Sequence, residues 1–516
     1  MRIRLVTALV VVLSVFPQTV STASAQVTSS DMSMLGLIFR NRFVPFSEAE
    51  GLPGLAAIVE RVAEIGPDGD DIERYQTMIE GMARMYLGRW DEGVEVASIL
   101  DVELPAKLYE PGAAVPVRMA PVYERTDPLI DGYLVNVRLL GPDGTVLNEA
   151  DEISFDTLET MRAVVVIPRD APSGRYLVEY TLSSVGAEQP IMATSRSIFV
   201  VEALEERLTE MLFDSRQRAV RRQIGRSRSR ALANTTVLWH LESYQRARSE
   251  WVGGPYQGYP AVMNYIFEQG ALMVEAMRFD EEIELVEGLI LDLGRGRDPL
   301  AARTGDMRLA YRSGVDRELV PFRVFIPDDY DRNASYPLVV ALHGSGGDEN
   351  TYMDGFDGTL KENAASRGYI IAAVNGRGPY EAYRTAGARD VVDVLDLVQR
   401  VYPIDEGRTY LTGHSSGGSG TVRIGFENAD RFAAIAPVAG FGSSDDLSKA
   451  LDLPVFLAIG GLDALVSPEG ARAFYETAQE LGMPDFQFVL NPAADHVGIV
   501  ADVMEQVFDW FDAHRR

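Results

Sequence analysis

The sequence predicts a multidomain protein in which helical segments and a β-sandwich precede a doubly wound α/β domain with a mostly parallel sheet. Three observations support this prediction. The chain has 516 residues, too many for one hydrophobic core at about 150 residues per domain. Residues 103–202 form short alternating runs between two stretches of helical periodicity. After residue 310, strand and helix patterns alternate, which is typical of a parallel sheet covered on both faces.

The first 25 residues resemble a secretory signal peptide. Arg2 and Arg4 supply a positive start, residues 5–16 an apolar run, and residues 23–25 (Ala-Ser-Ala) a cleavage site. A run of about 12 apolar residues is shorter than the ~20 that span a membrane, which favours cleavage over a retained anchor. We therefore expect an exported protein, periplasmic or extracellular, without membrane insertion after signal cleavage.

Composition narrows the chemistry. Cysteine is absent, which excludes disulfides, thiolate nucleophiles and cysteine-bound zinc. Any nucleophile must therefore be an oxygen or an amine. The net charge is −28, and a field of this sign repels nucleic acid and anionic lipid, so neither is an expected partner.

Residues 26–102 form the first predicted helical segment, and residues 103–202 the sandwich. In the sandwich, alternating runs such as residues 133–140 are broken by turns such as Gly-Pro-Asp-Gly at 141–144. Six or seven such strands in about 100 residues, with no helix between them, predict an immunoglobulin-like fold. The helical face before the sandwich is formed by Ile72, Tyr75, Met78, Ile79, Met82 and Met85.

Helical periodicity returns over residues 203–300, interrupted by the turn-rich loop 253–260. Residues 89–96 and 278–285 share an Arg-aromatic-Asp-Glu-x-aliphatic-Glu-aliphatic order, like the second helix of a tetratricopeptide-like hairpin. We hypothesise that the two helical segments pack together and that the sandwich is an insertion. Arginines between 216 and 230 form a basic island, interpreted as a solvated helix face rather than an anion-docking surface.

The α/β domain covers residues 301–516. Its predicted strands cover 322–326, 338–342, 369–374, 409–411, 433–438, 455–459 and 486–490, and its clearest helices 391–401 and 469–481. Residues 413–417, Gly-His-Ser-Ser-Gly, lie between a strand and a helical pattern, which is the context of the G-x-S-x-G nucleophile elbow. Glycines permit this tight turn, and the following helix N-terminus favours negative charge. We predict Ser415 as the nucleophile; the alternative is a simple Gly/Ser turn.

Serine needs a base to remove its proton. Of five histidines, His240 lies outside the domain, His343 and His414 belong to other motifs, and His514 is close to the C-terminus. His496 remains, directly after the last predicted strand, where the base of an α/β-hydrolase lies.

The acid of the predicted triad is Asp463, which follows strand 455–459 and gives the order Ser, Asp, His. The alternative is an aspartate that only closes a turn. Asp495, next to His496, is expected to point elsewhere. The oxyanion hole is predicted at the backbone amides of Ser416 and of Ser345, with Gly346 as the alternative to Ser345.

His343 begins the loop that contains Ser345 and Gly346, and we expect His343 to anchor that loop.

Residues 320–330, 336–347 and 404–418 resemble the secreted esterase branch of the α/β-hydrolase superfamily. Feruloyl esterases, polyhydroxybutyrate depolymerases and prolyl-oligopeptidase-like predicted peptidases are the nearest groups. The resemblance covers about 310–516 and implies acyl transfer by an α/β-hydrolase domain without cofactor or metal.

The sequence departs from that branch at the pocket. Ser416 stands where relatives often have Met, and residues 497–499 lack the aromatic that often follows the histidine. We predict an exported serine hydrolase that cleaves carboxylic esters through an acyl-enzyme on Ser415, with an ester or short peptide as substrate. The alternatives are a serine peptidase of prolyl-oligopeptidase-like type and a non-catalytic binding module. The short connection 438–454 predicts a site that is open or roofed by the N-terminal domains; the sequence does not define an oligomeric state.

Overall fold

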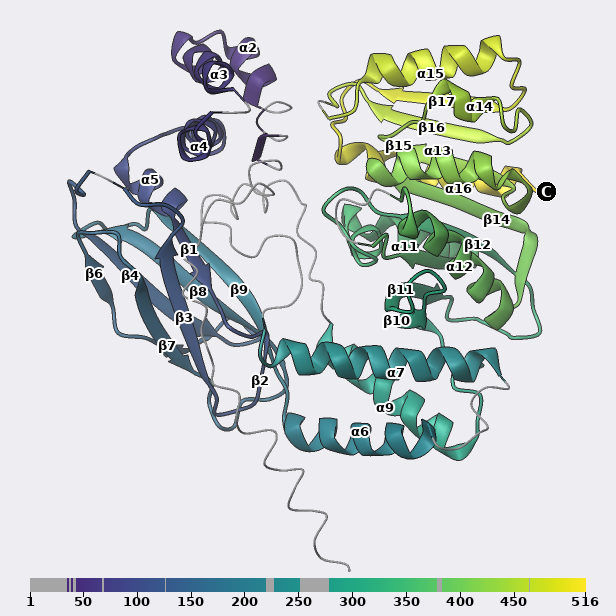
Figure 1. The fold of residues 1–516 in the computed structure, drawn as a ribbon, viewed down its shortest axis with the longest axis horizontal. Helices are drawn as coiled ribbons and strands as arrows, with labels where there is room; N and C mark the ends of the chain where they lie inside the picture. Colours follow the sequence, from purple (N-terminus) through teal and green to yellow (C-terminus); the bar gives the residue numbers. More distant parts are fainter. Residues whose placement is uncertain are drawn as a thin grey trace, which may run out of the picture.

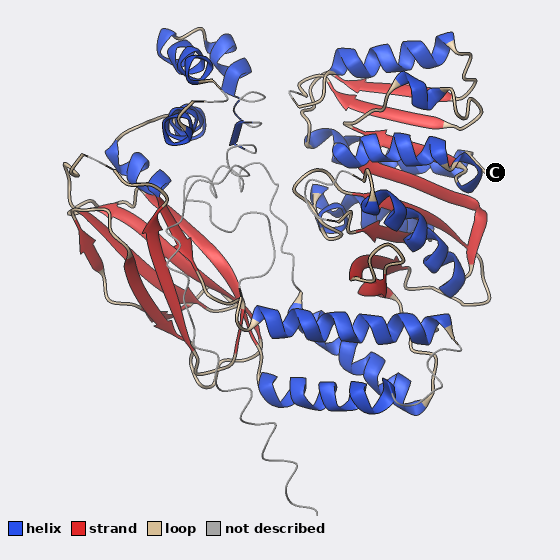
Figure 2. Cartoon of the chain, viewed as in Figure 1, coloured by secondary structure: helices blue, strands red, loops and turns tan. Residues whose placement is uncertain are grey.

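The computed structural model describes residues 35–36, 39, 43–66, 69–125, 127–219, 227–250, 278–377, 383–463 and 465–516. Figure 1 shows a β-sandwich on one side and a larger α/β domain on the other, and Figure 2 marks their helices and strands. The predicted signal peptide and the loop 253–260 lie outside the described residues. In the ranges given above, no helix is long and apolar enough to cross a membrane.

Among the described residues before the sandwich, 43–99 include the helices α2 (Val44–Glu50), α3 (Pro53–Ile65), α4 (Asp71–Leu87) and α5 (Glu92–Ile99). Asp70 and Asp91 cap α4 and α5, since their side chains accept backbone hydrogen bonds from Glu73 (2.8 Å) and Val94 (3.0 Å). The predicted apolar face of α4 is buried at its centre, but Ile72 is 42% exposed. The prediction for Ile72 was wrong because this residue lies in the first turn, at the solvent end of the helix.

The sandwich consists of two sheets. The smaller one has the order β1 (Leu100–Glu103), β3 (Ala114–Pro121), β7 (Met161–Val166). The larger one has the order β2 (Leu108–Tyr109), β9 (Met192–Val200), β8 (Gly174–Ser184), β4 (Tyr133–Leu140), β5 (Val146–Glu149), with β6 (Ile153–Phe155) beside β4. Alternate residues of β4 are buried, because one face of each sheet turns toward the other. These inner faces share a core with α2 to α5.

The hypothesis that the two helical segments pack together is wrong. Helices α6 (Leu204–Ala219), α7 (Arg228–Ala247) and α9 (Phe279–Arg295) contact each other and the α/β domain. Their buried apolar residues belong to the core of that domain, whereas α2 to α5 belong to the core of the sandwich. Figure 1 shows the two groups of helices at opposite ends of the sandwich. Each group buries its apolar face against the neighbouring domain instead of against the other group.

The α/β domain is built on an eight-stranded sheet with helices on both faces. The sheet order is β10 (Gly305–Arg312), β11 (Leu319–Ile326), β13 (Ile370–Val374), β12 (Tyr336–Leu342), β14 (Ile404–His414), β15 (Ala434–Val438), β16 (Val455–Gly460), β17 (Phe486–Asn491). In this order, β11 pairs in antiparallel orientation with β10 and with β13, and all pairs from β13 to β17 are parallel. The predicted mostly parallel α/β sheet is confirmed.

Where the α/β domain is described, seven α-helices accompany the sheet along the chain. They are α10 (Thr351–Asp354), α11 (Thr359–Arg367), α12 (Ala386–Val401), α13 (Ser416–Glu427), α14 (Ser444–Leu447), α15 (Pro468–Glu480) and α16 (Gly498–Ala513). Helices α11 and α16 contact each other, and α13, α14 and α15 follow one another in contact. Because the strands are parallel, β12, β14, β16 and β17 all end at one edge of the sheet, which is where the predicted site residues follow them.

Strand β10 was not predicted, and helix α7 covers its outer edge. Thr236 Oγ1 accepts a hydrogen bond from the amide of Ala310 (2.9 Å), and Thr235 Oγ1 donates to the carbonyl of Ala310 (2.6 Å). His240 Nε2 lies 2.9 Å from the carbonyl oxygen of Arg308. Side chains of α7 therefore satisfy backbone groups that an edge strand would leave open.

Candidate active site

Ser415 lies between β14 and α13 in a strained backbone conformation, with φ 58° and ψ −119°. A residue with a side chain at positive φ is uncommon and is held only by close surroundings. Here the backbone segments around Ser415 pack closely because glycines lie at the contacts. A Cβ on Gly413 would lie 2.4 Å from the carbonyl oxygen of Gly417, and a Cβ on Gly417 would lie 2.3 Å from that of Leu342. The turn therefore presents Ser415 at the carboxyl edge of the sheet, at the N-terminus of α13.

Asp463 and His496 form a buried pair at the same edge. Asp463 Oδ2 lies 2.8 Å from His496 Nδ1, and the two residues are 6% and 5% exposed. Asp463 Oδ1 accepts the amides of Leu465 and Val466, each at 2.8 Å. Because an ionised carboxylate only accepts hydrogen bonds, the ring proton stays on Nδ1. Nε2 of His496 is then left to accept a proton from another group.

Asp495 has a different role from its neighbour. Its Oδ1 accepts the amides of Val497 (3.0 Å) and Gly498 (2.7 Å) at the start of α16. Asp495 therefore stabilises the turn that leads into α16, while Asp463 holds the imidazole.

His414 contacts both the ring and the backbone carbonyl of His496, the predicted base. Its ring centroid lies 4.7 Å from that of His496, and its Nε2 lies 2.9 Å from the carbonyl oxygen of His496. Burial, followed by the nearby His496, lowers the pKa of His414 to about 3. The ring is therefore neutral, with its proton on Nε2 toward the carbonyl of His496. Phe356 covers His414 at a centroid distance of 5.0 Å.

The loop predicted to hold oxyanion donors lies against the nucleophile. A Cβ on Gly344 would lie 3.2 Å from Ser415 Cβ. The amide of Gly347 donates to the carbonyl of Gly344 (3.1 Å), and Gly346 has φ 85°. This is a tight turn that needs glycine at Gly346, and Ser345 and Gly346 are its two central residues. Their amides, with that of Ser416, stay the predicted donors.

His343 begins this loop and is held in place by three partners. Its Nε2 lies 2.8 Å from the carbonyl oxygen of Asn375, and its backbone amide donates to the hydroxyl of Tyr383 at 2.9 Å. Nδ1 lies 2.7 Å from the carbonyl oxygen of Gly344. The ring is only 3% exposed, so its contacts fix the course of the loop.

Sequence reasoning missed the buried charges beside this loop. Arg308 and Glu349 form an ion pair in which Arg308 Nε lies 2.6 Å from Glu349 Oε1, and the Glu349 side chain is fully buried. The available signal was an arginine inside the strand-like run 305–312, whose burial requires a partner.

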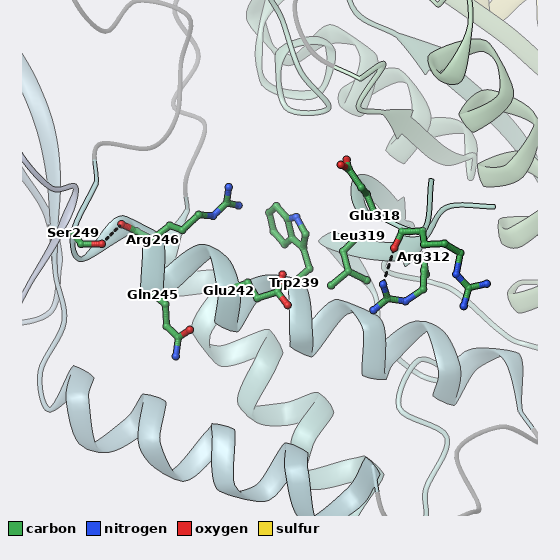
Figure 3. Close-up of a pocket in the computed structure, with 9 residues that line it drawn as sticks. Trp239, Glu242, Gln245, Arg246, Ser249, Arg312, Glu318 and Leu319 are labelled. Atoms are coloured by element: carbon green, nitrogen blue, oxygen red, sulfur yellow. Dashed lines mark hydrogen bonds between the residues drawn. The ribbon is translucent and has the colours of Figure 1, made fainter. Parts of the chain in front are cut away.

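An open pocket of about 720 Å³ lies elsewhere, between α7 and the turn that joins β10 to β11 (Figure 3). Trp239 and Arg246 line it from α7, Arg312 from the end of β10 and Glu318 from the turn. None of the triad residues lines this pocket. Across the described ranges, no group of three or more His, Asp or Glu side chains is arranged to hold a metal ion.

Comparisons with known proteins give a family-model match that lies within the α/β domain. The family model BD-FAE matches residues 324–437. The chain is 27% identical over 174 residues to the bifunctional acetylxylan esterase/xylanase XynS20E of Neocallimastix patriciarum, covering 32% of this chain and 24% of that protein. It is 27% identical over 159 residues to the probable feruloyl esterase C of Aspergillus flavus, covering 30% of this chain and 57% of that protein.

A shorter match concerns the human prolyl endopeptidase FAP, 28% identical over 115 residues, which covers 20% of this chain and 15% of that protein. The chain thus spans less than two thirds of the length of each of these relatives. Among solved structures, a ferulic acid esterase aligns over 40% of this chain and 97% of its own, at 16% identity and a TM-score of 0.36. A thermostable esterase aligns over 81% of this chain and 100% of its own, at 14% identity and a TM-score of 0.38. The sequence matches confirm the resemblance to the secreted esterase branch of the α/β-hydrolases.

Proposed function

We propose that this chain is an exported serine hydrolase that cleaves carboxylic esters through an acyl-enzyme on Ser415. The observation that carries the proposal is the buried Asp463–His496 pair, at 2.8 Å, on the sheet edge that also bears the strained Ser415. A fixed carboxylate, a ring with a free Nε2 and a serine in an elbow are the three parts that nucleophilic acyl transfer requires.

In the proposed reaction, Ser415 Oγ attacks the ester carbonyl while His496 Nε2 takes the hydroxyl proton. Asp463 stabilises the imidazolium that forms. The amides of Ser416 and Ser345, or Gly346 in place of Ser345, stabilise the tetrahedral oxyanion, and each such donor is worth on the order of a hundredfold in rate. His496 then gives the proton to the departing alcohol, and water repeats the sequence to release the acid.

The comparisons favour esters over peptides. The matches to proteins named acetylxylan and feruloyl esterases, over 174 and 159 residues, are longer than the match to a prolyl endopeptidase, over 115 residues. We therefore propose acetyl or feruloyl esters as the substrate class, with peptide cleavage as the second candidate. Export rests on the N-terminal apolar run of residues 5–16. The sandwich, proposed as immunoglobulin-like, would hold or shield the catalytic domain.

A fluorophosphonate probe tests whether Ser415 is the nucleophile. We expect labelling of the wild type and of Ser416→Ala, because alanine keeps the backbone amide of the proposed oxyanion hole. Ser415→Ala should not be labelled. A wild-type chain without labelling would favour the non-catalytic binding module.

A substrate panel then tests the ester assignment. It contains p-nitrophenyl acetate, methyl ferulate and a Gly-Pro amide with a fluorescent leaving group. We expect turnover of at least one ester and none of the amide. Faster cleavage of the Gly-Pro amide than of both esters would refute the ester assignment and support the peptidase.

A further inference from the structure

A chain of buried polar contacts leads from helix α9 to the loop that carries the proposed oxyanion donors. Its centre is Arg308 on β10, whose Nη1 lies 3.3 Å from Glu282 Oε1 of α9 and whose Nε donates to Glu349 Oε1 at 2.6 Å. Glu349 Oε2 accepts from Asn375 Nδ2 at 2.6 Å. The carbonyl of Asn375 faces His343 Nε2 at 2.8 Å. Each link is within hydrogen-bond distance, so the chain is continuous from α9 to His343.

Helix α7 covers this chain of polar contacts on one side, at Arg308. The Arg308 guanidinium carbon lies 4.6 Å from the centre of the Trp239 ring, a cation–π distance. The next residue, His240, bonds the carbonyl of Arg308 at 2.9 Å. Trp239 also lines the open pocket of Figure 3. The indole is thus one wall of that pocket and, on the Arg308 side, part of the cover of the ion pair.

The ends of the oxyanion loop are both tied to Asn375. His343, at the start of the loop, contacts its backbone carbonyl, and Glu349, at the end, contacts its side-chain amide. Ser345 and Gly346 lie between these two points. A second buried cluster, in which Arg323 pairs with Asp306 and Asp354, also donates to Asn350 Oδ1 at 3.2 Å, next to Glu349. The Arg308 cluster differs because it bonds the Glu349 side chain itself and, through Asn375, contacts His343 at the other end of the loop.

A gain in folding stability is a poor explanation for the buried charges in this chain of polar contacts. Burying an ion pair costs several kcal/mol of hydration for each ion, and apolar replacements are often neutral or stabilising. Burial raises the pKa of Glu349, but the charge of Arg308 and the hydrogen bond from Asn375 outweigh it and hold that pKa below its ordinary value. Glu349 is therefore ionised at neutral pH, and it is oriented by one donor from β10 and one from Asn375, directly after β13. Such a geometry suits positioning better than it suits stabilisation.

We propose that Glu349 is a positioning residue for the oxyanion loop, and that Arg308 and Glu282 make its orientation depend on the docking of α7 and α9. The proposal rests on the proposed function, since it needs an oxyanion at Ser415. It assigns a catalytic consequence to helices that lie outside the region matched by the family model.

The first test uses Glu349→Gln in the full chain, a change that keeps the shape of the side chain and removes its charge. We expect kcat for p-nitrophenyl acetate to fall roughly 10- to 100-fold, because a misplacement of about 1 Å costs on the order of 100-fold, with KM changed less than about twofold. A trifluoromethyl ketone, whose serine adduct places an oxyanion in the hole, should lose affinity by the same factor as kcat/KM. The control is Glu287→Gln on α9, the helix that also carries Glu282; there the carboxylate pairs with Arg207 at 2.8 Å near the surface, and kcat should equal that of the wild type.

The second test separates positioning from folding. The variant Glu282→Gln/Arg308→Met/Glu349→Leu removes all three charges together, so that none of the three is left buried without its partner. We expect a Tm close to that of the wild type and the same loss of kcat and of ketone affinity as in Glu349→Gln.

Two results overturn the proposal. One is wild-type kcat and ketone affinity in the triple variant, which would mean that Glu349→Gln acts only by leaving Arg308 short of a partner. The other is an unchanged kcat in Glu349→Gln itself. In both cases a labelled and active wild type leaves the proposed function intact, whereas a wild type without labelling or turnover overturns both proposals.

Discussion

Asparagine in place of Asp463 changes the chemistry of the proposed triad while leaving its shape. One carboxylate oxygen of Asp463 accepts two backbone amides at 2.8 Å, and the other accepts His496 Nδ1 at 2.8 Å. In Asp463→Asn, the side-chain carbonyl can keep the two backbone bonds only if its NH₂ group turns toward the ring. Nδ1 must then accept instead of donating, and the ring proton moves to Nε2. A protonated Nε2 cannot take the proton of Ser415.

The size of the effect follows from this change of tautomer. An equivalent substitution in a serine protease triad lowers kcat about 10⁴-fold, which corresponds to roughly 5 kcal/mol of transition-state stabilisation. We expect a loss of the same order here. The free energy of unfolding should change by less than about 1 kcal/mol, because both backbone amides keep their acceptor.

The assay is the initial rate of p-nitrophenyl acetate hydrolysis, with the melting temperature measured on the same samples. Asp495→Asn is the matched control. Asp495 holds the start of α16 by two backbone amides, and asparagine serves such a turn nearly as well as aspartate. Its kcat should therefore stay near that of the wild type. A kcat for Asp463→Asn within tenfold of the wild type, or an equal loss in Asp495→Asn, would refute the reasoning.

Two further predictions concern packing and pH. Gly417→Ala should lower the free energy of unfolding by about 1–3 kcal/mol and slow fluorophosphonate labelling, because the new Cβ would lie 2.3 Å from the carbonyl oxygen of Leu342. Gly54→Ala, where nothing lies within 4 Å, should leave both unchanged, and equal effects of the two variants would contradict the packing argument. Asp101→Asn should stabilise the sandwich at about pH 8 but little at about pH 4. Burial raises the pKa of Asp101 from 3.8 to about 6. The wild type therefore loses about 3 kcal/mol of unfolding free energy in total as the pH rises between these two values, and the asparagine variant does not. Chemical denaturation at both pH values measures this gain, and a gain independent of pH would count against the buried carboxylate.

The strand, elbow and helix around Ser415 could be predicted because their requirements are local. A turn as tight as the one at Gly413 and Gly417 restricts the sequence itself, and the glycines are visible without any knowledge of their neighbours. The order of Ser415, Asp463 and His496 follows from the order of the parallel strands, whose carboxyl ends meet at one edge. The 2.8 Å contact between Asp463 and His496 agrees with that order.

Other features depend on partners that lie far away in the sequence. Strand β10 carries Asp306 and Arg308 within a mixed run, and the partners that explain their burial include Arg323 and Glu349. Strand β14 begins at Ile404, earlier than the predicted 409. Its first part contains Gly407, a turn-like residue whose carbonyl accepts the amide of Arg516 at the C-terminus. Local patterns do not contain these contacts.

The packing of the helical segments shows a related limit. Periodicity indicates that a helix has an apolar face, but it does not indicate which surface covers that face. Helices α5 and α9 begin with the same order of residue types, at 89–96 and 278–285, yet α5 packs against the sandwich and α9 against the α/β sheet. Which surface covers the apolar face of a helix depends on the shape of the complete domains.

The cover that α7 places on β10 determines where this chain can be shortened. A fragment cut at residue 301 would keep the triad but lose Thr235, Thr236 and His240, which bond the backbone of β10. The exposed strand would then offer its free amides and carbonyls to a strand of another molecule, which is a route to aggregation. A truncated catalytic fragment should therefore begin before α6, near residue 203, even though the helices it retains lie outside residues 324–437, which the family model matches.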